Sequence, residues 1–177
     1  MPGCDAAGVV VEVGDGVTKF KNGDEVYSDI QDFGAGRPKQ WGTLAQYTVV
    51  EEYLVAPKPK NLSFEEAASL PLALLTAQQA FDIAKFEEGK SVFIVGGAGG
   101  VGSLAIQLAR HVYGASRIVS TSSTVKLEFV KSLGADVVID YTKQSYDQIS
   151  EKFDFVFDTI GQTLTPLALL AFTCQVT

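Results

Sequence analysis

The stretch at residues 91–102, SVFIVGGAGGVG, constrains the fold of this chain more than any other segment. A short apolar run leads directly into a glycine-rich turn, and an amphipathic segment at residues 103–113 follows at once. Gly97, Gly99 and Gly102 match the pattern G-x-G-x-x-G between a predicted strand and a predicted helix. Glycines in this pattern allow a tight turn, a close approach of the backbone to a pyrophosphate and tight packing of the helix. A glycine-rich turn without a ligand is the alternative, and the flanks favour a dinucleotide site.

The rhythm of the sequence after residue 91 predicts an α/β domain with a parallel sheet. Continuous apolar strands alternate there with amphipathic helices, a pattern typical of a parallel sheet that is covered on both faces. The predicted strands are residues 92–95, 117–121, 137–139 and 153–159, and the predicted helices are residues 101–113, 124–133 and 146–151. Residues 164–177 show no turn and no further strand, so we expect the sheet to end after its fourth strand.

The chain before this part reads as an antiparallel β region. Short β-branched runs at residues 9–13, 25–30 and 45–50 are separated by Gly/Asp turns. A connector with Pro57 and Pro59 follows, and Ser63 with a glutamate three residues later predicts a capped helix start. Pro71 interrupts this helical pattern, which resumes at residues 76–85. We therefore predict two domains, a β-rich one at residues 1–75 and a dinucleotide-binding one at residues 76–177.

Composition limits the partners of the chain. Its 177 residues, 46% hydrophobic and 20% charged, fit a globular protein of one domain, or of one domain and part of another. A net charge of −7 argues against a nucleic-acid partner and a polybasic membrane anchor. No apolar run is long enough to span a membrane, and no signal or transit peptide pattern is visible. We expect a cytoplasmic or chloroplast protein.

Residues suited to acid–base or metal chemistry are few. Cys4 and Cys174 lie near opposite ends, so they form neither a disulfide framework nor a zinc cluster, and they favour a reducing compartment. The only histidine, His111, lies on the helix after the glycine-rich turn, where it cannot assemble a metal set or a Ser-His-Asp arrangement. The residues therefore predict no metal and leave the catalytic side chains unknown, and the chemistry must come from a cofactor.

The end of the second predicted strand indicates which dinucleotide binds. An Asp or Glu normally accepts a hydrogen bond from the ribose 2′-hydroxyl of NAD there, whereas residues 119–126, VSTSSTVK, contain no carboxylate. Hydroxyls and Lys126 at a helix start suit a 2′-phosphate, which favours NADPH over NADH. Alternatively, Ser123 or Thr124 only caps the helix. Tyr141 lies along the adenosine side of the site or packs partly buried, and the sequence leaves both open.

Two groups of motifs resemble the medium-chain dehydrogenase/reductase superfamily over residues 2–162. The first group is PGCDAAGVV at residues 2–10, FKNGDEV at 20–26, GTLAQY at 42–47, AASLPLA at 67–73 with Thr76, and the glycine-rich turn. The second group is APKPKNL at residues 56–62, GGAGGVGSLAIQLA at 96–109, Ser122-Ser123-Thr124 with Lys126, and IDYT at 139–142. Within the superfamily these motifs are similar to the zinc-independent quinone oxidoreductase-like branch, and in particular to plant enone oxidoreductases.

The resemblance implies part of a GroES-like antiparallel β domain followed by a partial Rossmann-type parallel sheet. It also implies NADPH-dependent reduction of the carbon–carbon double bond of a small enone, alkenal or quinone. Hydride would go to the β-carbon, and solvent would protonate the enolate. The implied cofactor-binding residues are Thr76, Gly97, Gly99, Gly100, Val101, Gly102, Ser123, Thr124, Lys126, Tyr141 and Ile160. Among them Gly100 and Val101 would face the pyrophosphate, and Ser123, Thr124 and Lys126 would hold the 2′-phosphate.

The chain also departs from the family pattern. Cys4-Asp5 stands where zinc-dependent relatives have a metal-linked His-Glu pair, and their four-cysteine lobe is absent, so we expect a metal-free enzyme. Relatives, expected to be monomers or homodimers, continue beyond both ends of this pattern, and their N-terminal segment carries a lysine near the cofactor. We therefore expect an internal segment of the enzyme. The alternative is a shortened product that binds nucleotide weakly or not at all and has no turnover.

Overall fold

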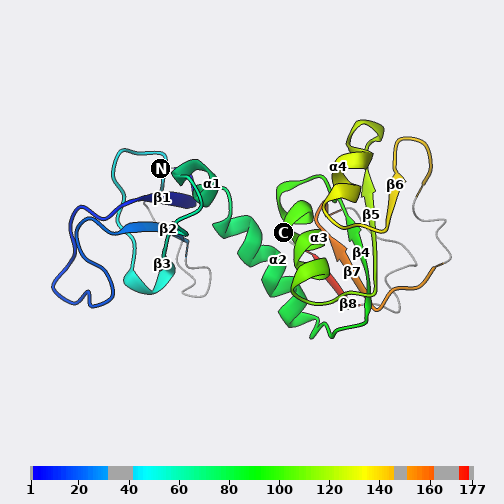
Figure 1. Ribbon diagram of the computed structural model, residues 1–177, viewed down its shortest axis with the longest axis horizontal. Helices are drawn as coiled ribbons and strands as arrows, with labels where there is room; N and C mark the ends of the chain where they lie inside the picture. The colour runs from blue at the N-terminus through cyan, green and yellow to red at the C-terminus, as the bar shows by residue number, and fades with distance from the viewer. Residues whose placement is uncertain (1, 32–41, 146–150, 162–171, 176–177) are drawn as a thin grey trace. The chain divides into compact units, whose positions relative to one another are not determined.

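The computed structural model describes residues 2–31, 42–145, 151–161 and 172–175 (Figure 1). The chain divides into two compact units, Met1–Leu72 and Ala73–Thr177. The first is built on a small antiparallel sheet and the second on a parallel sheet with helices. These are the predicted α/β architecture and its preceding β region.

The first unit contains a sheet of three antiparallel strands in the order β1-β2-β3. The strands are β1 (Asp5–Val9), β2 (Glu25–Asp29) and β3 (Val55–Pro57), and the 3-10 turn η2 (Glu52–Leu54) precedes the last of them. The predicted strand at residues 25–30 is confirmed. The predicted strands at residues 9–13 and 45–50 are wrong, because the first lies four residues earlier and the third lies in the predicted connector.

Pairing partners explain both errors. Gly23 N–H donates to Val10 O at 2.8 Å and Val10 N–H to Asp24 O at 2.9 Å, which closes the turn and ends the β1–β2 ladder at Val9. The β-branched residues beyond it favour a strand but do not face β2. Residues 44–49 are exposed, whereas β3 lies against residues 26–28 of β2. Pro57 is tolerated there because β3 is an edge strand.

Two helices follow the small sheet. The capping box that starts α1 (Phe64–Ala68) is confirmed: Glu66 N–H donates to Ser63 Oγ at 3.1 Å, and Ser63 N–H donates to the Glu66 carboxylate at 2.8 Å. Pro71 does not interrupt a helix but begins α2 (Pro71–Ile83), where its missing N–H costs nothing. Leu72 N–H, in the first turn of α2, donates to the Asp5 carboxylate of β1 at 2.7 Å.

The second unit contains a parallel sheet in the order β6-β5-β4-β7-β8 (Figure 1). Its strands are β4 (Ser91–Val95), β5 (Arg117–Ser122), β6 (Val137–Asp140), β7 (Phe155–Asp158) and β8 (Phe172–Gln175). In addition to most of α2, this unit contains the helical segments α3 (Gly100–His111), η3 (Thr124–Lys126) and α4 (Leu127–Ser132). The four predicted strands are therefore confirmed, while the predicted helix at residues 146–151 lies almost wholly outside the described residues.

The prediction that the sheet ends after its fourth strand is wrong. Phe172–Gln175 forms a fifth strand, β8, which pairs in parallel with β7. The outer edge of β7 offers free backbone groups to any segment that reaches it, and Phe and Thr are good strand formers. The strand was missed because residues 164–171 contain no glycine, and so no glycine turn marks its start.

The core of the second unit lies on the two faces of this sheet. Successive strand residues point to opposite faces, so Val92 and Ile94 belong to one apolar cluster and Phe93 and Val95 to the other. The first cluster also contains buried residues of α2, α3 and α4, namely Ala77, Phe81, Ala105, Ile106 and Val130. Burial of β4 and β7 on both faces explains why they read as unbroken apolar runs.

Candidate functional site

Residues 96–102, called the glycine turn below, connect β4 to α3 at the carboxyl edge of the parallel sheet. Gly96 has φ +83°, the left-handed conformation that favours glycine. Its N–H donates to Thr121 Oγ1 at 2.9 Å, and Gly97 N–H donates to Thr121 O at 3.0 Å. A Cβ on Gly102 would lie 2.2 Å from Gly96 O. The turn is therefore fastened to β5 on one side and closely packed under α3 on the other.

The opposite side of the glycine turn is open. A Cβ on Gly100 would meet only the Ala73 side chain, at 4.0 Å. Gly99 is the N-cap of α3 and supplies no side-chain cap, so the first N–H groups of the helix, those of Gly100 and Val101, have no acceptor among the described residues. Free N–H groups at the start of a twelve-residue helix, with no side chain above them, suit an anion such as a pyrophosphate.

The turn after β7 packs directly on the glycine turn. A Cβ on Gly96 would lie 2.7 Å from both Thr159 Oγ1 and Ile160 Cδ1. Asp158, which is fully buried, accepts through Oδ1 from the N–H groups of Ile160 at 2.9 Å and Gly161 at 3.1 Å. Its Oδ2 has no hydrogen-bond partner within the described part of the chain. The structure thus brings Ile160, 56% exposed, beside the glycine turn, and sequence reasoning assigned no role to Asp158.

Thr76 lies on α2, three residues after Ala73, whose side chain adjoins the Gly100 position. It is half-buried. Thr76 therefore lies about one helical turn along α2 from Ala73, and no hydrogen bond joins it to the glycine turn in the part that the structure describes.

The other predicted residues gather where β5 and β6 end. Ser122 is the register partner of Asp140, and Tyr141 N–H donates to Ser122 O at 3.1 Å. Lys126 is exposed, Ser123 is half-buried and Tyr141 is 53% exposed. Because Gly96 and Gly97 also bond to Thr121 near the end of β5, this second group and the glycine turn occupy neighbouring strand ends of one sheet edge.

Asp140 is the residue of this edge that sequence reasoning missed. The residue is 8% exposed. Its carboxylate accepts hydrogen bonds from the hydroxyls of Thr124 and Thr142, which lower its pKa to about 2. Lys143 Nζ lies 3.4 Å from Oδ2. The residues after β5 contain no carboxylate, as predicted, but β6 brings one beside them. Since parallel strands end at the same edge, the pair Asp140-Tyr141 after the third strand was the available signal.

The capping alternative is settled by these bonds. Ser123 is the N-cap of η3, yet its side chain makes no capping hydrogen bond, and the Thr124 hydroxyl donates to Asp140 Oδ2 at 2.5 Å. The predicted helix start is one 3-10 turn followed by the six-residue α4. Such a short helix adds little to anion binding, so side chains must supply most of any attraction at this point.

The donors needed for a metal site do not come together in the described residues, which contain no group of three His, Cys, Asp or Glu side chains. The Asp5 carboxylate is occupied by Leu72 N–H. Burial, then the charges of Asp29 and Asp5, raise the pKa of the Cys4 thiol, which disfavours the metal-binding thiolate. His111 ends α3 and is exposed. None of the described helices is long and apolar enough to cross a membrane.

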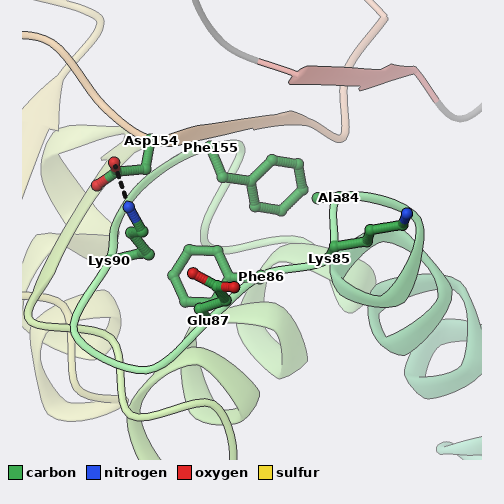
Figure 2. Close-up of a pocket in the computed structure, with 7 residues that line it drawn as sticks. All are labelled: Ala84, Lys85, Phe86, Glu87, Lys90, Asp154 and Phe155. Atoms are coloured by element: carbon green, nitrogen blue, oxygen red, sulfur yellow. Dashed lines mark ion pairs between the residues drawn. The ribbon is translucent and has the colours of Figure 1, made fainter.

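A separate hollow lies at the amino edge of the parallel sheet (Figure 2). It has a volume of about 160 Å³ and is lined by Ala84, Lys85, Phe86, Glu87, Lys90, Asp154 and Phe155. Lys90 Nζ points at the Asp154 carboxylate, 3.6 Å away, and the rings of Phe86 and Phe155 lie 6.0 Å apart. Lys90 and Asp154 precede β4 and β7, so this hollow lies at the edge of the sheet opposite to the glycine turn.

Comparisons with known proteins match both units. Residues 1–60 match the family described as alcohol dehydrogenase GroES-like domain, and residues 100–174 match the family described as zinc-binding dehydrogenase. The chain is 60% identical over 162 residues to a 2-methylene-furan-3-one reductase of Solanum lycopersicum, a match that covers 92% of the chain and 42% of the relative. It is 55% identical over 161 residues to an NADPH-dependent alkenal/one oxidoreductase, chloroplastic, of Arabidopsis thaliana, with 91% and 42% covered.

Among solved structures, the quinone oxidoreductase of Coxiella burnetii superposes with a TM-score of 0.82 at 36% identity. That match covers 93% of this chain and 51% of the other. The chain thus spans less than half the length of the two plant relatives and about half of this bacterial one.

Proposed function

We propose that this chain, which belongs to the medium-chain dehydrogenase/reductase superfamily, binds NADPH at the carboxyl edge of its parallel sheet and serves the reduction of α,β-unsaturated carbonyls or quinones. The names of the two plant relatives and of the bacterial structure support an oxidoreductase of this kind. The name of the relative from Arabidopsis thaliana supports NADPH as the reductant.

The open side of the glycine turn is the observation that carries this proposal. The free N–H groups of Gly100 and Val101 would accept the pyrophosphate, and no Cβ on Gly99 or Gly100 stands in its path. The 2′-phosphate would lie at the ends of β5 and β6, beside Ser123, Lys126 and Tyr141. Ile160, which packs on Gly96, and Thr76, one turn of α2 beyond Ala73, would contact the remainder of the cofactor.

When bound, NADPH supplies the hydride that goes to the β-carbon of the substrate, and a proton from solvent completes the reduction of the double bond. The residues of this chain would bind and orient the cofactor. We propose that no zinc ion takes part, although one matching family is named for zinc binding. The support is the donor chemistry: Asp5 serves as a cap for α2, and the raised pKa of Cys4 keeps its thiol protonated.

The finer substrate class and the compartment follow from the same relatives. An enone or alkenal is supported by the two plant names, and a quinone by the bacterial structure. We propose the chloroplast or the cytoplasm as the compartment, and the chloroplastic relative supports the former.

The test is a titration of the purified chain with NADPH and with NADH, followed by calorimetry and by thermal unfolding. A ligand that binds only the folded state raises its stability, by about 2.7 kcal/mol at a hundred times the dissociation constant. We expect a clear preference for NADPH. Equal affinity for both nucleotides would contradict the cofactor assignment. Binding of NADPH without turnover of a small enone would restrict the function of this chain to cofactor binding.

A matched pair of glycine variants locates the site. Gly100→Ala adds a methyl group where no described atom is closer than 4.0 Å, so the fold should persist while both nucleotides bind roughly tenfold more weakly. Gly8→Ala adds the same group to β1, where nothing lies within 4 Å, and should change neither affinity. Unchanged binding by Gly100→Ala would place the pyrophosphate elsewhere.

A further inference from the structure

Asp140 is a nearly buried carboxylate whose oxygens are all engaged. Oδ1 accepts from Thr142 N–H at 3.0 Å and from the Thr142 hydroxyl at 2.6 Å. Oδ2 accepts from the Thr124 hydroxyl at 2.5 Å and lies 3.4 Å from Lys143 Nζ. These contacts tie together the end of β6 and the turn that follows β5. They belong to the edge where the 2′-phosphate is proposed, yet a carboxylate attracts no phosphate.

The bonds to Asp140 settle what the neighbouring hydroxyls can do. A threonine hydroxyl has one proton to donate, and both Thr124 and Thr142 give theirs to the carboxylate. The two hydroxyl oxygens also lie 3.1 Å from each other. A phosphate dianion is an acceptor and needs donors. The Thr124 hydroxyl therefore donates its proton to Asp140 and has none left to donate to a phosphate. This is contrary to what the family resemblance implies for Thr124.

Two side chains in the turn after β5, those of Ser123 and Lys126, have hydrogen-bond donors that are still available. The Ser123 hydroxyl makes no capping bond, and neither it nor the exposed Lys126 ammonium has a partner within the described ranges. Their positions depend on the backbone from Ser122 to Lys126, which Asp140 holds through Thr124. The charge of Asp140 itself is offset by Lys143.

We propose that Asp140 is a positioning residue that determines the preference for a 2′-phosphorylated nucleotide. It takes the hydroxyl protons of Thr124 and Thr142, fixes the turn after β5, and so presents Ser123 and Lys126 to the phosphate. This inference rests on the proposed function, because it assigns the part of that site that distinguishes NADPH from NADH.

A double-mutant cycle tests it, with dissociation constants for NADPH and NADH measured on the full chain. Asp140→Asn and Thr124→Val should each weaken NADPH binding about fivefold, leave NADH within about twofold, and show no further loss when combined. Thr124→Ser keeps the hydroxyl and should restore the preference. Glu128→Gln removes an exposed carboxylate from α4 and should leave both affinities unchanged. Thermal unfolding of each variant confirms that it folds.

Each contrary result is distinct. Losses that add in the double variant would make Thr124 a direct phosphate ligand and overturn the inference. Tighter NADPH binding by Asp140→Asn would show that the carboxylate only repels the phosphate, which also overturns it. Equal affinity of the unaltered chain for both nucleotides would overturn the proposed function instead. A preference that persists unchanged in Asp140→Asn would overturn the positioning role alone.

Discussion

The two ends of the proposed nucleotide site consist of different chemical groups. The glycine turn offers backbone N–H groups and keeps side chains away, whereas the cluster of Thr124, Asp140, Thr142 and Lys143, called the Asp140 cluster below, consists of hydrogen-bonded side chains. The first would bind the pyrophosphate that NADPH and NADH share. The second would lie beside the 2′-phosphate, the group by which the two nucleotides differ. Affinity and preference are therefore assigned to separate parts of one sheet edge.

The two parts are also held differently. The glycine turn is fixed by close packing, since Cβ atoms on Gly96 or Gly102 would collide with neighbouring atoms. The Asp140 cluster is fixed by charge-assisted hydrogen bonds, which depend on the ionised state of the Asp140 carboxylate. Changes at the closely packed glycines, Gly96 and Gly102, should therefore lower the stability of the fold and weaken the binding of both nucleotides. Changes in or beside the Asp140 cluster should reduce the preference for NADPH over NADH and change the free energy of unfolding little.

The largest effect is expected from Gly102→Ala. The new Cβ would stand 2.2 Å from Gly96 O, and because that atom belongs to the backbone, the turn or α3 must move. We expect a loss of about 3 kcal/mol in the free energy of unfolding and no measurable binding of either nucleotide. Denaturant unfolding and calorimetry measure the two quantities. A stable variant that still binds NADPH would show that close packing does not hold the turn.

The next effect concerns Asp158, which supports the glycine turn from β7. Asp158→Ala leaves the N–H groups of Ile160 and Gly161 without their acceptor, which should cost about 2 kcal/mol. Asp158→Asn keeps an acceptor oxygen and removes a buried charge whose Oδ2 has no partner in the described residues, so it should cost less. Unfolding curves of the two variants decide this. Equal losses would mean that the charge itself, and not the acceptor, stabilises the turn.

A smaller effect tests the cation beside the Asp140 cluster. Lys126→Ala should weaken NADPH binding roughly tenfold and leave NADH binding unchanged, because only the 2′-phosphate gains from the ammonium. The difference should shrink as salt is added. Lys131→Ala is the matched control, since Lys131 lies on α4, which follows η3 directly, and pairs with Glu128 instead. Equal weakening of both nucleotides by Lys126→Ala would remove the distinction between the two ends of the site.

Strands that are buried on both faces are easier to predict from the sequence than strands that are only partly buried. The strands of the second unit are buried on both faces, so they read as unbroken apolar runs that local pattern alone identifies. The strands of the first unit are short and only partly buried, and their place depends on a partner. Residues 45–50 look more like a strand than Val55–Pro57, yet only the latter meets β2. Strand β8 depends in the same way on the edge of β7.

The candidate site divides along the same line. The glycine turn is continuous in sequence, so its glycines could be named before the fold was known. The Asp140 cluster joins residues 16 and 18 positions apart, through the register of β5 with β6. Asp158 supports the turn through its own loop and carried no motif. The residues that local sequence patterns did not identify are those brought to the site by the pairing of strands.

The smallest expected effect is the pH dependence that Asp140 contributes. Hydrogen bonds from Thr124 and then Thr142 lower its pKa from 3.8 to about 2 in the folded chain. A lowered pKa means that the ionised carboxylate stabilises the fold above about pH 4, and that this contribution disappears as the pH falls toward about 2. The unaltered chain should therefore lose more stability than Asp140→Asn over this interval, measured by denaturant unfolding at stepped pH.

Other carboxylates do not confuse this comparison. Hydrogen bonds also lower the pKa values of Asp24, Glu52 and Asp154, but these groups are present in both proteins and their contributions cancel in the difference. Gly100→Ala, whose change lies in the glycine turn, should follow the unaltered chain throughout. If the curves of the unaltered chain and Asp140→Asn run parallel, the ionised carboxylate does not hold the cluster. The two ends of the site would then differ in the groups they present, but not in the forces that hold them in place.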